Sequence, residues 1–205
     1  MEHLKPAVAY VILTVALLLI FLIIGYPAFI AIFAHLDPFK FAKKITRVAV
    51  FGFSTSSSAA TLPLNVKTTV EELGVDEKIA SFVLPLGMTI NMNGTAIMQV
   101  IATLFIAGCA GYSISFTQLV VIALLALIAS AGTPAAPGSG AIILFTILSG
   151  LGYVNDAAML AYSLILAINR PIEMLVTALN VVGDSATSIY VAKSEGVLNE
   201  DVYNA

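Results

Sequence analysis

The sequence predicts an all-α integral membrane protein, and three observations support this: the composition, the spacing of the charges and the breaks in the apolar segments. Of the 205 residues, 60% are hydrophobic and 10% are charged, and the mean hydropathy is +1.02. Water-soluble domains carry about 25% charged residues. The chain is therefore expected to lie in a lipid bilayer and to cross it several times.

The first apolar stretch, residues 6–34, contains no charged side chain. A helix needs about 20 residues to cross a bilayer, so this stretch has length left over for tilt. Juxtamembrane basic residues usually stay in the cytoplasm, and here they follow the stretch, at Lys40, Lys43, Lys44 and Arg47. We interpret residues 1–47 as a spanning helix and a basic loop that lies inside. With a net charge of −3 and this single basic cluster, a nucleic-acid partner is excluded.

Residues 48–66 carry no charge and contain a serine-rich centre, Ser54–Ser58. The apolar pieces on either side are each too short to span. Irregular backbone at membrane depth survives only where protein buries it or where it lines a cavity. We therefore expect a re-entrant hairpin over residues 48–66, with its tip near the midplane. The serines either cap helix ends or contact substrate through Ser57 and Ser58, and both roles can hold at once.

The stretch from Ile79 to Asn155 contains no Asp, Glu, Lys or Arg, yet two clusters rich in Gly, Pro, Asn and Ser interrupt it, at residues 87–94 and 130–140. The same argument predicts a broken helix over residues 79–112 and a second re-entrant hairpin over residues 117–153. The glycines and prolines of the second tip either allow a gate to swing or form a purely structural turn.

A long final helix is expected over residues 156–193, and it carries Arg170, Glu173 and Asp184. An ionisable residue at bilayer depth is costly and therefore indicates function. Two successive units of hairpin and helix are typical of transporters built from repeats, in which half-helix ends point at substrate and ions.

An enzymatic function is not expected. The two histidines, His3 and His35, flank the first helix outside the polar clusters, and serine without a nearby base is a poor nucleophile. Asp184 is the only aspartate between Asp156 and the C-terminal tail, so a pair of catalytic aspartates is absent from the membrane segments.

Several motifs resemble those of the dicarboxylate/amino acid:cation symporter family, which includes glutamate and neutral amino acid transporters. These motifs are Ser56-Ser57-Ser58 with Thr61-Leu62-Pro63, Leu84-Pro85-Leu86-Gly87, Ile90-Asn91-Met92-Asn93-Gly94-Thr95-Ala96, Gly132-Thr133 through Pro137-Gly138-Ser139-Gly140, and Asn180-Val181-Val182-Gly183-Asp184. The resemblance covers the whole chain but only the later half of a family member. It implies a portion of the transport domain of an elevator-type transporter in the plasma membrane, homotrimeric when full length. A separate N-terminal half is one source of the helices that form the earlier half of a family member.

The resemblance implies two sodium sites built from oxygen ligands of the kind that small cations prefer. One is formed by Gly87, Asn91, Asn180 and Asp184. The other is formed by Thr89 with the backbone of residues 130–133, including Ser130, Ala131 and Thr133. Sodium-coupled members usually have an aspartate where this chain has Asn93, and that aspartate ligates a further sodium ion. A third sodium site is therefore doubtful, and the coupling ion, sodium or a proton, stays open.

The resemblance also implies that Glu173 holds the amino group of a substrate and that Val176 stands where carriers of acidic substrates have an arginine. The remaining implied substrate contacts are Ser57, Ser58, Thr95, Ala136, Gly140, Thr177 and Asn180. Because a buried carboxylate without a partner costs several kcal/mol, we expect a neutral amino acid. If Arg170 reaches the pocket, an acidic amino acid or dicarboxylate is again a candidate substrate. Otherwise Arg170 pairs with Glu173 three residues later.

The expected function is cation-coupled symport of an amino acid. The alternative is a truncated, non-transporting membrane remnant or a regulatory fragment of such a transporter. An upstream reading frame encoding the first five helices would favour a split transporter.

Overall fold

The computed structural model describes residues 4–205, which form helices joined by turns, with no strand among them. In the first segment, the π-helical turn Phe21–Gly25 joins α1 (Leu4–Ile20) to α2 (Tyr26–Phe29). A second π-helical turn, Ile30–Ala34, follows α2. The other helices are α3 (Pro38–Thr55), α4 (Ser58–Glu71), α5 (Glu77–Ile90), α6 (Asn93–Cys109), α7 (Phe116–Ala131), α8 (Ser139–Leu151), α9 (Asp156–Ile168), α10 (Arg170–Ser194) and α11 (Glu200–Asn204).

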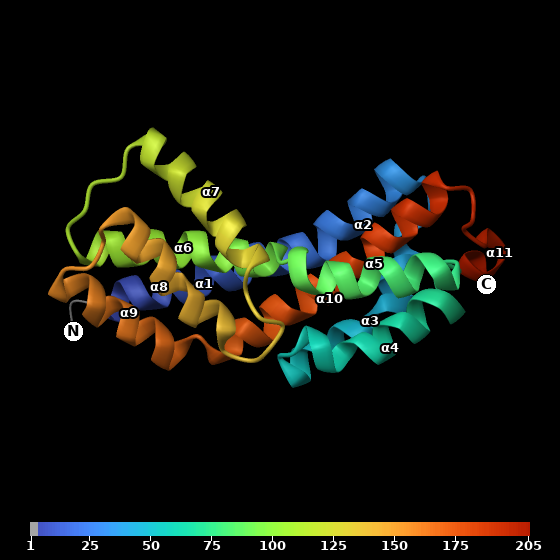
Figure 1. Ribbon diagram of the computed structural model, residues 1–205, viewed down its shortest axis with the longest axis horizontal. Coiled ribbons are helices and arrows are strands. Elements are labelled where there is room, and N and C mark those ends of the chain that lie inside the picture. Colours follow the sequence, from blue (N-terminus) through green and yellow to red (C-terminus); the bar gives the residue numbers. More distant parts are fainter. Residues whose placement is uncertain (1–3) are drawn as a thin grey trace.

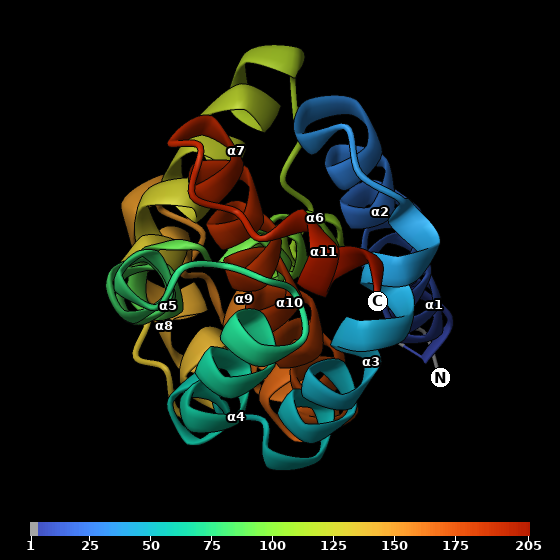
Figure 2. The same ribbon diagram turned by 90° about the vertical axis from the view of Figure 1, so that its right-hand side faces the viewer.

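The helices form an elongated bundle, with the two ends of the chain at opposite ends of the molecule (Figure 1). Viewed along the long axis, α10 lies in the middle of the other helices (Figure 2). Nearly every residue from Ile172 to Ile189 is buried. Glycines allow close approach to this helix, since a Cβ on Gly52 would lie 2.9 Å from the Val181 side chain. Small residues at such crossings are typical of membrane helices.

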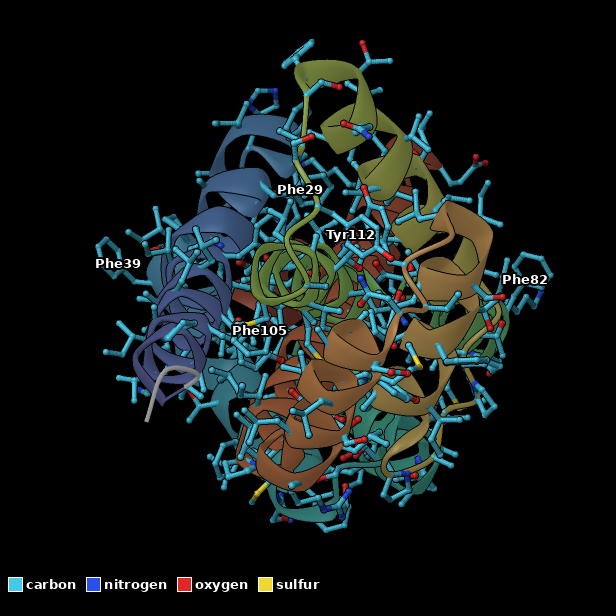
Figure 3. The ribbon with its side chains drawn as sticks, turned by 90° about the vertical axis from the view of Figure 1, so that its left-hand side faces the viewer. Phe29, Phe39, Phe82, Phe105 and Tyr112 are labelled. Carbon is cyan, nitrogen blue, oxygen red and sulfur yellow. The ribbon has the colours of Figure 1, made fainter. Side chains whose placement is uncertain are left out.

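Three helical runs are long and apolar enough to cross a membrane: Pro6–Ala34, Glu77–Cys109 and Arg170–Ser194. Large apolar side chains also cover much of the outer surface. Phe39 is 84% exposed and Phe82 is 70% exposed, and both point away from the molecule on its two sides (Figure 3). A surface of this kind suits lipid or other membrane helices. The described residues therefore have the all-α membrane architecture that the composition predicts.

The first hairpin is longer than the expected residues 48–66. The expected basic loop before it is helical, because α3 begins at Pro38. The Asp37 side chain accepts the backbone N–H of Phe39 at 2.8 Å, which caps the helix, and proline suits the first turn. The prediction of a loop was wrong because it relied on charge and overlooked this start signal.

The expected single helix over residues 156–193 is also wrong, since it divides into α9 and α10 at Asn169. Pro171 has no N–H to donate to the carbonyl of Ala167, and its ring crowds the preceding turn. The broken helix consists of α5 and α6 with a gap at Asn91–Met92, and the second hairpin consists of α7 and α8. Both lie within a few residues of the expected ranges.

The C-terminal segment folds back onto the base of the first hairpin. The Lys44 ammonium donates to the carbonyl oxygens of Glu72 at 2.9 Å, Val202 at 2.8 Å and Tyr203 at 2.9 Å. The buried Tyr203 donates its hydroxyl to the carbonyl of Asp37 at 2.7 Å. Burial and the Asp37 charge raise the pKa of the Tyr203 phenol, so it remains a donor. Lys44 thus joins the end of α4, the start of the first hairpin and α11.

Replacing Lys44 with methionine keeps the apolar stem but removes three donors, and each lost bond to a charged group is worth about 1.5–3 kcal/mol. We expect thermal unfolding of the purified protein in detergent to shift down by several degrees. Lys43→Met, at an exposed position on the same helix, is the matched control and is expected to leave the midpoint unchanged. Equal shifts for both variants would contradict the role of Lys44.

Candidate functional site

The tips of the two hairpins meet at the middle of the molecule, where the start of α4 lies beside the loop between α7 and α8 (Figure 1). The Ser57 hydroxyl donates to the carbonyl of Ala135 at 2.9 Å, and the backbone N–H of Ala59 donates to the same oxygen at 3.4 Å. Ser57 also caps α4 by accepting the N–H of Ala60. One serine therefore ends a helix and joins the two tips.

A cavity of about 30 Å³ lies between these tips, the break of α5 and α6, and one face of α10. Eight of the nine predicted substrate residues line it: Ser58, Thr95, Ala136, Gly140, Glu173, Val176, Thr177 and Asn180. Ser57 is not part of the lining. The other lining residues are Ser56, Met92, Met98, Thr133, Pro134, Ala135, Gly138 and Ser139. The structure thus brings together residues that are widely separated in the sequence.

Glu173 is the only acidic residue in the lining. One of its carboxylate oxygens accepts the backbone N–H of Ala141 at 3.1 Å, in the first turn of α8. The other lies 3.7 Å from the Arg170 guanidinium, which is 55% exposed and does not line the cavity. This geometry agrees with an ion pair between Arg170 and Glu173. The starts of α4 and α8 also face the cavity, and helix N-termini favour anions.

Asn180 compensates for the broken backbone. Its side-chain oxygen accepts the N–H of Gly94 at 2.8 Å, and its amide nitrogen donates to the Thr95 hydroxyl at 3.1 Å. A Cβ on Gly94 would lie 2.8 Å from the carbonyl oxygen of Val176. Only glycine therefore lets the start of α6 approach α10 this closely.

Asp184 lies behind the cavity and is 2% exposed. It accepts the amide N–H of Asn91 at 2.8 Å, and a Cβ on Gly87 would lie 2.6 Å from the same carboxylate oxygen. Within residues 4–205, no Lys, Arg or His forms an ion pair with it. A buried carboxylate without a counter-charge is costly. A carboxylate oxygen is a hard ligand of the kind that small cations prefer, although in this structure the neighbouring Asn91 presents its amide nitrogen to it.

Asn93 belongs to the same polar group. Its amide nitrogen donates to the side-chain oxygen of Asn91 at 2.8 Å and to the Tyr26 hydroxyl at 3.1 Å. Sequence reasoning did not single out Tyr26, which directly follows the first π-helical turn. A phenol within an apolar stretch needs a buried partner, and that signal could have identified it.

In the second expected ion-binding set, the Thr133 N–H donates to the carbonyl of Ser130 at 3.0 Å, but among the described residues no hydrogen bond joins Thr89 to this segment. Thr89 is exposed, and its hydroxyl donates to the carbonyl of Leu86 at 2.7 Å. The hydroxyls of Ser130, in α7, and of Thr133, just after it, donate to the α7 carbonyls of Leu127 and Ala129. Ala131 is exposed. In the described chain, therefore, each hydroxyl of this set is satisfied locally.

Met98 and Gln99 were also not predicted from the sequence as residues of the site. Met98 lines the cavity, and Gln99 donates to the carbonyl of Gly140 at 3.1 Å, which fixes the start of α8. They follow Thr95 by three and four residues and thus share its helical face. This spacing was the available signal.

Comparison with known proteins identifies the family of this chain. The model of the sodium:dicarboxylate symporter family matches residues 1–194. An excitatory amino acid transporter of Caenorhabditis elegans is 34% identical over 177 residues, which are 86% of this chain and 34% of the relative. Excitatory amino acid transporter 1 of Rattus norvegicus is 34% identical over 176 residues, 86% of this chain and 32% of the relative. Human excitatory amino acid transporter 2 is 36% identical over 162 residues, which are 78% of this chain and 28% of the relative.

The chain spans about a third of the length of these curated relatives. The matched family consists of transporters, which confirms the prediction that the chain is not an enzyme. The apolar helices agree with a membrane protein. The motifs, the cavity and the family match together lead to one conclusion: this chain belongs to the sodium:dicarboxylate symporter family.

Proposed function

We propose that this chain is the substrate-carrying part of a sodium-coupled symporter that moves a neutral amino acid across the plasma membrane. The observation that carries the proposal is one cavity in which Glu173 faces the N-terminal ends of α4 and α8. Asp184, a carboxylate without an ion-pair partner in the described chain, lies directly behind it.

The two charged groups of an amino acid match the two halves of this cavity. The ammonium group binds the Glu173 carboxylate by a charge-assisted hydrogen bond. The α-carboxylate binds N–H groups at the starts of α4 and α8, near Ser58 and Ser139, together with the Asn180 amide.

The absence of a basic residue from the lining supports a neutral side chain. Val176, which is 5% exposed, lies where a second carboxylate would need a partner. An acidic substrate is the alternative, since the family name includes dicarboxylates and the relatives are named excitatory amino acid transporters. For that substrate, Arg170 would have to leave its exposed position and turn into the cavity.

Sodium is the proposed coupling ion, held by Asp184 with oxygens of Gly87, Asn91 and Asn180. The ion would supply the positive charge that offsets the buried carboxylate. A proton on Asp184 would do the same and is the alternative. The second proposed set, Thr89 with Ser130, Ala131 and Thr133, would have to draw on backbone carbonyl oxygens, because its hydroxyls are used locally.

The second hairpin is the proposed gate. A cavity of about 30 Å³ has room for about one or two water molecules but not for an amino acid. The tip between α7 and α8 must therefore move to admit substrate. Gly138 in this tip has a φ of 84°, a conformation that glycine adopts without strain. In this proposal the domain moves as one body against a trimeric scaffold, formed by the part of the relatives' length that this chain does not match.

Uptake of labelled serine, alanine and aspartate into liposomes tests this function. The chain is reconstituted alone and with an N-terminal half, with and without a sodium gradient. We expect sodium-dependent uptake of a neutral amino acid and no uptake of aspartate. Aspartate uptake would refute the neutral substrate. If no substrate is taken up in any condition although the protein is inserted in the liposomes, the result would favour the non-transporting remnant or regulatory fragment.

A basic side chain at position 176 should change the substrate. We expect Val176→Arg to acquire aspartate uptake and to lose at least tenfold in uptake of neutral amino acids, because the guanidinium pairs with a second carboxylate. Val176→Met, which adds length without charge, is the control and should lose neutral uptake without gaining aspartate. If aspartate stays excluded from Val176→Arg, the side-chain pocket lies elsewhere.

Removing the charge of Asp184 should weaken sodium binding. We expect Asp184→Asn to raise the half-saturating sodium concentration at least tenfold, with elution as an intact protein in size-exclusion chromatography. Asp156→Asn changes an exposed aspartate at the start of α9 and should leave the sodium dependence unchanged. An unaltered sodium curve for Asp184→Asn would remove this residue from the ion site.

A further inference from the structure

The break between α9 and α10 lies beside the cavity. The side chain of Asn169, at this break, bonds to other helices instead of capping α10. Asn169 occupies the position before α10, where asparagine commonly caps a helix, yet its side chain makes no cap bond. Only its backbone carbonyl serves α10, by accepting the N–H of Glu173 at 3.0 Å. The amide group is therefore directed elsewhere.

That amide connects two other helices to the break. The Tyr10 hydroxyl, from α1, donates to the Asn169 side-chain oxygen at 2.6 Å. The Asn169 amide nitrogen donates to the sulfur of Met98, from α6, at 2.9 Å. All three residues are at most 2% exposed, so water does not compete for these groups. We call this set the Tyr10–Asn169–Met98 contact.

Both ends of the contact lead to the cavity. Met98 lines the cavity, and its terminal methyl would lie 3.1 Å from a Cβ on Gly140. On the other side, Asn169 begins the turn that carries Glu173, which binds the N–H of Ala141. A shift of Asn169 would thus move the Glu173 carboxylate relative to the tip of the second hairpin.

The backbone alone does not hold this turn firmly. Pro171 has no N–H, so one hydrogen bond that would continue α9 into α10 is missing. The angle of the break then depends on side chains, and Asn169, at 1% exposed, is the buried polar side chain located there, whereas Arg170 is exposed. A role limited to satisfying buried polar groups would not require that these groups connect the break to the cavity lining.

We propose that Asn169 is a positioning residue for the substrate site. Through the Tyr10–Asn169–Met98 contact, it fixes the break between α9 and α10 and thereby holds Glu173 against the start of α8. This inference rests on the proposed function for its effect on substrate. Its effect on the hairpin can be measured without transport.

The test uses Tyr10→Phe, which removes one hydroxyl and keeps the ring next to Phe105. Hydrogen–deuterium exchange of the purified chain, read by mass spectrometry, is expected to speed up about tenfold or more in peptides covering residues 138–144. Peptides from α4 are expected to be unchanged. Where uptake is measurable, the KM for substrate should rise about tenfold with little change in the maximal rate. Tyr190→Phe, at a phenol that is 41% exposed, is the matched control.

A second variant keeps the proposal falsifiable if one substitution disturbs folding. Asn169→Ala removes both bonds of the contact and should speed up exchange at least as much as Tyr10→Phe, and the double variant should be no worse than Asn169→Ala, because the Tyr10 bond is already lost in it. Asn169→Asp keeps the acceptor for Tyr10 but loses the donor to Met98, so exchange in residues 138–144 should stay fast, and slow exchange in this variant would contradict a role for the bond to Met98.

The outcomes separate this inference from the function on which it rests. Faster exchange at residues 138–144 alone supports positioning, even if the wild-type chain transports nothing. Exchange that rises equally in α4, or that does not change, overturns it. Normal KM values in Tyr10→Phe and Asn169→Ala would also overturn it, in a chain whose transport is otherwise established.

Discussion

The structure depends on one constraint, that interrupted backbone in apolar surroundings must find its hydrogen-bond partners inside the protein. The central helix α10 supplies many of them. Asn180 accepts the N–H of Gly94, and Glu173 accepts the N–H of Ala141. Asn65 of the first hairpin donates to the carbonyl of Val181 at 3.0 Å. The broken helix and both hairpins therefore converge on one helix.

The same constraint explains why polar groups gather at a single place. A side chain that completes the backbone of a broken segment must lie where helix ends meet, and helix ends carry the partial charges that attract ions and zwitterions. Glycines then set how closely the elements approach. A Cβ on Gly183 would lie 2.1 Å from the Tyr26 hydroxyl, and one on Gly87 would contact Asp184. Packing and the proposed binding chemistry thus rely on the same few residues.

Asn93 changes the character of the polar group behind the cavity. An aspartate offers only acceptors when ionised, whereas an asparagine also offers two N–H donors. Here the Asn93 amide nitrogen donates to both Asn91 and Tyr26. The position therefore contributes donors to neutral partners, and Asp184 is the acidic member of the group. This agrees with the expectation that a third sodium site is doubtful.

Local sequence patterns were enough to predict much of the fold of this protein. Apolar stretches interrupted by Gly, Pro, Asn and Ser predicted both hairpins and the broken helix, because hydrocarbon tolerates such breaks only in a few arrangements. The spacing of Glu173, Val176, Thr177 and Asn180 predicted one face of α10, since helical periodicity is a local property. Their common cavity agrees with that prediction.

Contacts between distant segments were decided only by the tertiary structure. The Tyr10 hydroxyl meets Asn169 across 159 positions of sequence, and Tyr26 meets Asn93 across 67. Neither partner is specified by a local pattern, because several buried polar groups could satisfy each phenol. The helical start of α3 and the break at Asn169, by contrast, have local signals in the Asp37 cap with Pro38 and in Pro171, which charge and hydropathy alone do not report. Periodicity determines which face of a helix is polar, whereas the fold decides which groups that face meets.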